Sequence, residues 1–320
     1  MSEASLRQAG NFVDYTPAVA LSAGQVLQLG DGRAAVATDA IAAGAQGAVQ
    51  VFGTFKVAKA ADIALLYGCE AWWDHSANVV TYKKVNDRDF YLGRVQADAV
   101  AAATTVEVAF NVRPRYDVDA LRDGYLSVPT GTQAVGGFGF PKILGGAASL
   151  ELTATSEAQC IDLLSTDKFS KDANAIIEAV FRPADAGSGA AVDFNIGIAD
   201  GTSTTDADAI GTSVFAHIDG GSLNVLAESD DAVTEVAATD TTADIVAGSA
   251  VANRTTVWFD TRNPADVQIY VNAVLVLPDA VFTIAATANP LGLIAHLEKT
   301  TGTTTGRFVI DALRAWFAEQ

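Results

Sequence analysis

The chain has 320 residues, of which 50% are hydrophobic, 18% are charged and 8% are aromatic. Acidic residues number 38 and basic residues 20, which gives a formal net charge of -18. Residues 1–125 hold 14 acids and 11 bases, whereas residues 126–320 hold 24 acids and 9 bases. Because phosphate backbones repel such an acidic surface, we expect no direct nucleic-acid binding by the second part.

The apolar segments are short, and none approaches the ~18 consecutive apolar residues that a membrane-spanning helix needs. The first residues, Met-Ser-Glu-Ala-Ser-Leu-Arg-Gln, contain no apolar signal segment. We therefore expect a soluble protein made in a cytoplasm, with no membrane partner. The two cysteines, Cys69 and Cys160, have no metal-type spacing and are predicted to be buried free thiols in different domains.

Residues 10–113 read as short strands separated by glycine-containing turns. Hairpins are predicted at three places: residues 30–32, residues 53–54 and residues 74–78. Helix is scarce, and residues 60–66 are its best short candidate. The pattern predicts a small all-β barrel or sandwich domain over residues 1–113.

Residues 114–148 mix proline, glycine and charged residues without steady periodicity. We interpret them as a connector, in which residues 117–122 could form one helical turn.

Residues 149–320 return to alternating apolar and polar positions and predict a larger two-sheet sandwich. Ten strands are expected: 149–155, 175–182, 191–199, 214–218, 222–227, 255–261, 267–271, 274–276, 291–297 and 308–317. Residues 294–316 read as a strand, a Thr/Gly turn and a strand, which suggests a closing hairpin. Ile310, Leu313 and Trp316 cannot share one face of a regular strand, so a bulge is predicted near Ala312.

The N-terminal segment resembles a family of small β-domains from tailed phages, the capsid decoration or head-stabilising proteins. The resemblance rests on the pieces "LSAGQVLQLGDGRAAVATDAIAAGAQGAVQVFGTFKVAKA", "AWWDHSANVVT" and "YLGRVQADAVAAATTVEVAFN". It implies attachment to the major capsid protein. Proteins of this kind commonly sit at three-fold positions, so the resemblance also implies a homotrimer.

Residues 149–317 resemble concanavalin-like or laminin-G-like jelly-roll domains that are appended to phage structural proteins. The resemblance rests on the pieces "VDFNIGIAD", "VFAHIDGGSLNVLAES", "ADVQIYVNAVLV" and "PLGLIAHLEKTTGTTTGRFVIDALRAW". It implies a lectin-like sandwich. Some relatives of this fold are glycosidases with a closely spaced Glu/Asp/Glu triplet on one strand, and this chain lacks such a triplet.

His296 and Glu298 are two residues apart and would share one face of a strand. A general acid–base pair would need a further carboxylate across a cleft, and the sequence does not place one. We interpret the pair as strand-end residues before the Thr/Gly turn. With no nucleophile, phosphate-loop or dinucleotide motif, we assign no catalytic residue and no cofactor, and expect that the protein is not an enzyme.

An acidic loop holds Asp200, Asp206 and Asp208, and calcium prefers several oxygens from one flexible loop. The glycine and the terminal glutamate of an EF-hand are missing, so a calcium site and a solvated loop both stay open. The three histidines are scattered along the sequence, and no transition-metal cluster is predicted.

Trp72 and Trp73 are adjacent and should point to opposite faces of a strand, with His75 close by. Aromatic residues are enriched at interface cores, so Trp72, Trp73 and His75 are candidates for a protein interface. The alternative is an ordinary core position followed by a turn.

The leading hypothesis is a decoration or cement protein of a tailed-phage head. The N-terminal domain would bind and stabilise the shell, and the acidic lectin-like domain would project outward from the capsid surface. The alternative is a carbohydrate-binding adhesin of a phage fibre or tail that contacts host-surface glycans.

Overall fold

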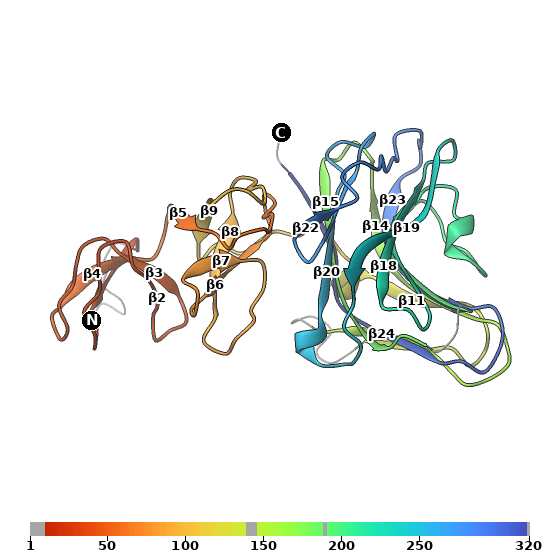
Figure 1. The fold of residues 1–320 in the computed structure, drawn as a ribbon, viewed down its shortest axis with the longest axis horizontal. Coiled ribbons are helices and arrows are strands. Elements are labelled where there is room, and N and C mark those ends of the chain that lie inside the picture. The colour runs from red at the N-terminus through yellow and green to blue at the C-terminus, as the bar shows by residue number, and fades with distance from the viewer. Residues whose placement is uncertain (1–9, 139–145, 188–190, 319–320) are drawn as a thin grey trace, which may run out of the picture. The chain divides into compact units, whose positions relative to one another are not determined.

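The computed structural model describes residues 10–138, 146–187 and 191–318, which form two compact units, Met1–Arg115 and Tyr116–Gln320 (Figure 1). Residues 1–9, at the beginning of the predicted first domain, lie outside the described residues. Residues 139–145, near the end of the predicted connector, also lie outside them. No helix in the described part of the chain is long and apolar enough to cross a membrane. The predicted all-β class is confirmed, because nearly all regular structure consists of antiparallel strands.

The first unit begins with a four-stranded sheet in the order β1-β4-β3-β2. Its strands are β1 (Phe12–Tyr15), β2 (Val26–Gln28), β3 (Ala34–Ala37) and β4 (Gly47–Gln50). The predicted hairpin at residues 30–32 joins β2 to β3, and Gly32 has a φ of 89° there. Ala35, Ala37, Ile41 and Val49 make a small buried core, which suits a thin sheet built from small residues.

A five-stranded sheet follows in the order β5-β9-β8-β6-β7. Its strands are β5 (Thr54–Ala58), β6 (Glu70–Asp74), β7 (Val79–Thr81), β8 (Phe90–Val95) and β9 (Thr105–Phe110). The hairpin predicted at residues 74–78 joins β6 to β7. The hairpin predicted at residues 53–54 is wrong, since β4 and β5 belong to different sheets. Residues 60–66 form turns rather than a helix, because Leu65 pairs with Ala99 in an isolated bridge.

Asn111 links the two sheets of the first unit. Its side-chain Nδ2 donates to the carbonyl oxygens of Ala34 (2.9 Å) and Val51 (2.6 Å), and its Oδ1 accepts from the Ala34 amide (2.9 Å). The residue has a φ of 60°, a left-handed conformation that asparagine tolerates better than most residues. One side chain therefore satisfies three backbone groups at the junction.

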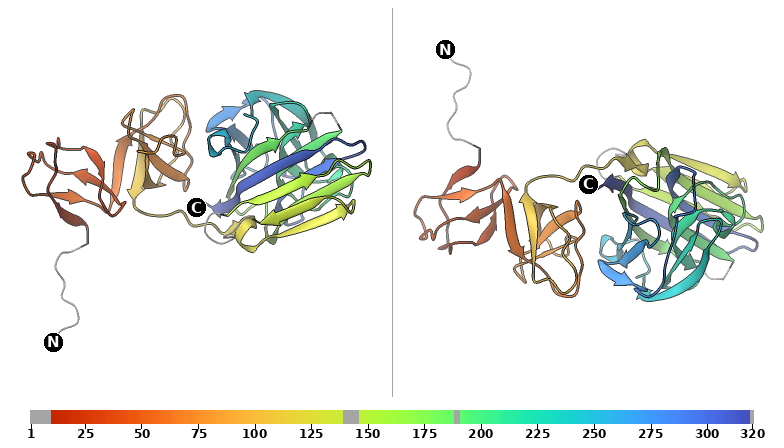
Figure 2. Two further views of the ribbon diagram at one scale, coloured as in Figure 1. Left: turned by 90° about the horizontal axis from the view of Figure 1, so that it is seen from below. Right: turned by 90° about the horizontal axis from the view of Figure 1, so that it is seen from above.

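The second unit contains an eight-stranded and a seven-stranded sheet. The first has the order β12-β13-β24-β15-β20-β21-β22, with β10 also paired to β24 (Figure 2). Its strands are β10 (Val118–Asp119), β12 (Val135–Phe138), β13 (Ala148–Leu152), β15 (Ala175–Asp185), β20 (Thr255–Asp260), β21 (Gln268–Val271), β22 (Val274–Val276) and β24 (Gly306–Phe317).

The seven-stranded sheet has the order β11-β14-β23-β16-β17-β18-β19. Its strands are β11 (Tyr125–Thr130), β14 (Gln159–Phe169), β16 (Val192–Ala199), β17 (Ser213–Asp219), β18 (Asn224–Asp230), β19 (Glu235–Asp244) and β23 (Leu291–Lys299). One large apolar core joins the two sheets, and at its centre the rings of Phe194 and Phe308 stack with centroids 4.0 Å apart.

All ten strands expected in residues 149–320 are present, but the predicted closing hairpin is wrong. β23 and β24 lie in opposite sheets, so residues 300–305 cross from one layer to the other. The bulge predicted near Ala312 is present: Val180 pairs with Ala312 and Phe181 with Ile310, which leaves Asp311 without a partner in the register.

The segment interpreted as a connector differs most from its prediction. After Arg115 it contributes β10, the short helix α1 (Ala120–Asp123), β11 and β12 to the second unit. Burial explains this, because Val118, Ala120 and Leu121 belong to the large core although their apolar run is too short to show periodicity. Asp119 caps α1 by accepting from the amides of Leu121 and Arg122.

Candidate functional site

Two rows of polar side chains cross the outer face of the seven-stranded sheet. In the first row, neighbouring strands β14, β23, β16 and β17 place in register the residues Asp162, His296, Asn195 and His217. In the second row, the same strands place in register the residues Cys160, Glu298, Asp193 and Asp219. Because side chains two apart on a strand share a face, all eight project to the same side. The intervening residues of these strands, such as Phe194 and Leu297, point into the sandwich core.

A loop covers these rows although they lie on the face away from the main core. The loop runs from Asp200 to Thr212 and contains the short helix η1 (Ala207–Ala209). Its Ala207 and Ile210 pack with Phe215 and Ile294 in a separate apolar cluster on this face. Hydrogen bonds also attach the loop to the sheet, including a 2.6 Å bond from Thr130 Oγ1 to the carbonyl of Thr204. The polar rows are therefore largely shielded from solvent.

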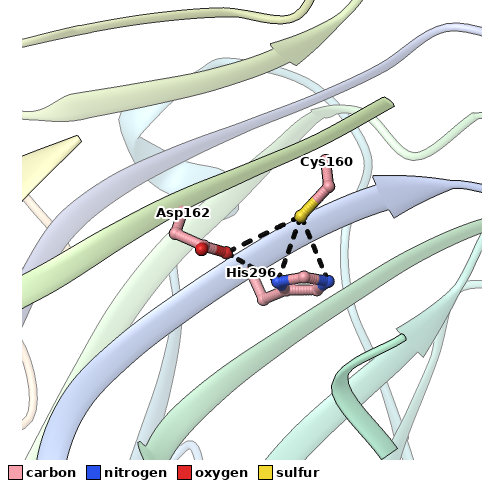
Figure 3. A group of neighbouring side chains, drawn as sticks. All are labelled: Cys160, Asp162 and His296. Carbon is pink, nitrogen blue, oxygen red and sulfur yellow. Dashed lines mark hydrogen bonds and ion pairs between the residues drawn. The ribbon is translucent and has the colours of Figure 1, made fainter. Parts of the chain in front are cut away.

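His296 is fully buried between two carboxylates. Its Nδ1 lies 2.6 Å from Oδ1 of Asp162, and its Nε2 lies 2.8 Å from Oε2 of Glu298. The sulfur of Cys160 lies 3.5 Å from Nδ1 and 3.6 Å from Nε2, and Figure 3 shows it beside the ring. Since both ring nitrogens face a carboxylate oxygen, both donate, and the ring is a cation.

His217 repeats this arrangement two strands away. Its Nδ1 lies 3.2 Å from Oε2 of Glu228, and its Nε2 lies 2.9 Å from Oδ1 of Asp219. Asp208 reaches in from the covering loop to 3.8 Å from Nδ1. Between the two histidines, Nδ2 of Asn195 donates to Oε1 of Glu228 at 3.0 Å.

The carboxylates determine the charge of both rings. Burial alone would lower the pKa of His296, but hydrogen bonds with Asp162, Cys160 and Glu298 outweigh burial and raise the pKa to about 12. For His217, burial is likewise outweighed by Asp193, Glu228 and Asp208, and the pKa rises to about 11.

Burial acts in the opposite direction on the acids and on the thiol. It raises the pKa of Glu228 to about 7, against the favourable charge of His217. It also raises the pKa of Glu298 and of the Cys160 thiol. Two imidazolium ions thus sit in a cluster that holds more carboxyl groups than cations.

His296 and Glu298 lie near the end of β23 and before the Thr/Gly segment, as interpreted. The sequence did not predict their burial: they are 0% and 2% exposed, because the loop over this face covers them. Burial and occupied nitrogens leave the pair without access to a substrate. The histidines are scattered along the sequence, but strand register brings two of them, His217 and His296, into one row.

Among the described residues, three groups have the donor atoms and spacing to hold a metal ion. They are Cys160 with Asp162 and His296; Asp193 with His217 and Asp219; and Asp208 with His217 and Glu228. The calcium candidates Asp200, Asp206 and Asp208 have separate partners. Asp200 accepts from Asn289 (2.8 Å), Asp206 caps η1, and Asp208 faces His217.

The interface candidates lie on β6 and the turn after it. Trp73 is 5% exposed and packs inward, whereas Trp72 is half-buried and donates from Nε1 to Oε2 of Glu70 at 3.1 Å. His75 begins the turn, where its amide donates to Asp89. Both cysteines are buried and free, as expected, but Cys160 belongs to the polar cluster described above.

Sequence reasoning placed none of the following cluster members in a site: Cys160, Asp162, Asp193, Asn195, His217 and Asp219. A signal was present in the two-residue spacing itself. Four strands each carry a pair of polar or thiol side chains two residues apart on the outward face: Cys160 and Asp162, Asp193 and Asn195, His217 and Asp219, His296 and Glu298. The repetition marks a shared polar face, whereas each pair taken alone does not.

Comparison with protein families matches residues 7–110 to the phage cement protein family. Comparison with curated proteins finds no match. Solved structures with a similar fold include distant likenesses. A structure from work on endo-acting O-glycanases of the human gut microbiota is 11% identical, with 61% of this chain and 99% of that chain covered and a TM-score of 0.39.

Two further structures resemble the chain to a similar degree. LamAcat from Zobellia galactanivorans is 12% identical, with 54% of this chain and 78% of that chain covered and a TM-score of 0.40. The carbohydrate-binding module CBM66 from Bacillus subtilis is 12% identical, with 59% of this chain and 94% of that chain covered and a TM-score of 0.34. Identities and TM-scores this low give no information about binding or catalysis by this chain. Residues 7–110 of this chain match the phage cement protein family, and residues 116–320 form a sandwich of two antiparallel sheets.

Proposed function

We propose that this chain is a structural protein of a tailed-phage virion, which binds the head shell through its N-terminal unit and stabilises it. The match of residues 7–110 to the phage cement protein family carries this proposal. The partner would be the major capsid protein, and the location would be the capsid surface.

Cementing needs no chemistry, because it works by mass action. A subunit that binds the assembled shell and not its separated parts stabilises the shell by RT ln(1 + [L]/Kd). The charge balance of the chain is compatible with this role. Residues 1–125 are close to neutral, whereas the strong acidity lies in residues 126–320, where it would favour solubility over close packing.

Exposed apolar side chains on the first unit supply surface for such a contact. They are Phe12, Val19, Phe52, Val85 and Val100, each between 41% and 75% exposed. We include self-association as a homotrimer in the proposal. Sedimentation of the purified chain measures this directly.

A non-enzymatic role is part of the same proposal. A glycosidase needs two carboxyl groups on either side of an open cleft. Here the acidic pair nearest to that description, Asp162 and Glu298, is buried and shares one imidazolium. The cluster is suited to holding strands together.

A second candidate function is glycan binding by the second unit. A depression of about 160 Å³ lies beside Tyr125, which is 51% exposed, and is lined by Ser165, Lys168 and Thr202 among others. An exposed aromatic ring beside hydroxyl and ammonium groups is suitable for contact with a sugar ring. Binding on a glycan array that is lost in Tyr125→Ala, and kept in the surface control Leu223→Ala, would support this candidate.

The test of the leading proposal uses capsids of the encoding phage that lack this protein. Adding the purified chain should give saturable binding and a gain in the temperature at which the capsids rupture. Capsids that bind none of the chain, or that bind it without any gain in resistance, would refute the cementing role.

A further inference from the structure

Three chemically different donor groups converge on the outer face of the seven-stranded sheet. They are the thiol of Cys160, the carboxylate of Asp162 and the imidazole of His296, with donor atoms within 4.8 Å of one another. Figure 3 shows the three side chains pointing toward one another from β14 and β23. All three residues are at most 1% exposed.

Internal hydrogen bonding leaves this group incompletely satisfied. Oδ1 of Asp162 bonds to His296, but its Oδ2 is buried and has no hydrogen-bond partner. Buried carboxylate oxygens without a partner are costly and rare in native proteins. The two negative charges of the carboxylates around His296 also exceed the single positive charge of the ring. The group lacks a positive charge and a partner for Asp162 Oδ2.

We propose that Cys160, Asp162 and His296 bind a divalent metal ion of the zinc class. Asp162 would offer Oδ1, with Oδ2 free to approach the same ion, and His296 would offer Nδ1, the nitrogen that faces Asp162. The carboxylate of Glu298 would then accept a hydrogen bond from the remaining N–H of the ring. This is the contact that Nε2 makes with Oε2 of Glu298 now, at 2.8 Å. A carboxylate behind a metal-bound histidine fixes the ring orientation and its tautomer.

The donor set selects the class of ion. Thiolate and imidazole ligands suit zinc and its neighbours, whereas calcium and magnesium prefer oxygen ligands alone. Binding must release two protons to solvent, one from the thiol and one from the imidazolium, because the ligands are the thiolate and the neutral ring. The ion then replaces the proton between His296 and Asp162.

The other two metal-capable groups are less suitable. Both depend on His217, whose two nitrogens already face Glu228 and Asp219. One includes Asp208, whose side chain is 51% exposed. Neither contains a thiol, so neither has the soft ligand that favours zinc over calcium.

The covering loop controls access to the proposed site. The carbonyl oxygen of Ser203 lies 3.8 Å from the sulfur of Cys160, so the loop closes directly over the group. An ion would enter while this loop is open or during folding. Once bound, it would join β14 to β23 and stabilise the second unit.

Cobalt(II) is the probe for the experiment, because a thiolate bound to cobalt gives a charge-transfer band in the near ultraviolet. The full chain is unfolded in urea with reductant and chelator, then refolded with cobalt, so that the closed loop cannot block entry. The chain has two cysteines, so Cys69→Ser leaves Cys160 as its one thiol. Cys160→Ser removes the proposed ligand, and Glu298→Gln weakens the support behind His296.

We expect one equivalent of cobalt per chain, with the band present in the wild type and in Cys69→Ser, absent in Cys160→Ser, and removed by zinc. Glu298→Gln should bind about 10–100-fold more weakly. If Cys160→Ser does not fold, the Cys69→Ser spectrum alone decides, because its band can come from Cys160 and from no other residue. No stoichiometric binding, no band in Cys69→Ser, or a band that survives in Cys160→Ser would overturn the proposal.

Discussion

The imidazole Nε2 of His296 lies 2.8 Å from Oε2 of Glu298, two residues further along the same strand. Both side chains project from one face of β23 and are buried under the loop that covers this face. The pair is thus an internal ion pair rather than an open catalytic pair. Its partner on the other ring nitrogen, Asp162, comes from a strand more than 130 residues earlier in the chain.

The histidine clusters predict that stability depends on pH. The pKa of His217 is raised to about 11 in the folded protein, against about 6.5 when unfolded. A raised folded pKa contributes stability that is complete below pH ~6.5 and is lost as pH rises toward 11. His217→Gln should therefore cost about 3–5 kcal/mol near neutral pH, a figure typical of a broken buried ion pair.

The measurement is urea unfolding of the full chain at several pH values. The difference in free energy of unfolding between wild type and His217→Gln should shrink as pH rises from 7 to 10. In the full chain, His75→Gln is the matched control, since His75 lies in the other unit and outside the cluster. A difference that stays constant or grows over this range would show that His217 is not held as a cation.

Asp311, the residue of the β24 bulge, forms salt bridges with two arginines. Its oxygens accept from Nε (2.7 Å) and Nη2 (2.9 Å) of Arg182 and from Nε of Arg254 (2.9 Å), and its side chain is 9% exposed. Asp311→Ala would leave the guanidinium of Arg182 without its carboxylate in a largely buried position. We expect a loss of ~3–5 kcal/mol in the free energy of unfolding.

The exposed pair of Lys171 and Asp172 serves as the control for Asp311, since the side chain of Asp172 is 66% exposed. Asp172→Ala should change stability very little, because solvent screens such pairs. Equal effects of Asp311→Ala and Asp172→Ala in thermal unfolding would argue against a structural role for the bulge.

Trp72 and Trp73 allow stability to be separated from binding. Trp73→Ala should destabilise the first unit by ~3–5 kcal/mol, because its ring is buried in the core. Trp72→Ala should leave folding nearly intact and weaken capsid binding at least ~10-fold, the effect of losing an aromatic anchor at an interface. Circular dichroism and capsid co-sedimentation measure the two quantities. Undiminished capsid binding by folded Trp72→Ala would remove Trp72 from the proposed interface.

Local patterns were sufficient to predict much of the fold. Alternation predicted β16, and the Gly-Asp-Gly turn predicted the β2–β3 hairpin, because side-chain period and turn chemistry are local properties. β14 was missed because Asp162 and the polar run from Ser165 to Lys168 obscure its apolar positions. β19 was missed because Thr, Ala and Asp dominate it, and Val236 is the one large apolar side chain among its ten residues.

The polar cluster could not be predicted in the same way. Whether Asp162 meets His296 depends on which strands are neighbours and in which register they pair. Both are properties of the whole sandwich, and a one-residue shift would move either side chain to the opposite face. The covering loop adds a further condition, since it converts an outward polar face into a buried one.

The most direct test of the cement role is binding by each unit separately. Residues 1–115 and residues 116–320 are purified and added to capsids of the encoding phage that lack this protein. We predict that residues 1–115 bind saturably, compete with the full chain and raise the rupture temperature of the capsids, whereas residues 116–320 do none of these. Folded residues 1–115 that fail to bind, while the full chain or residues 116–320 bind, would contradict this prediction.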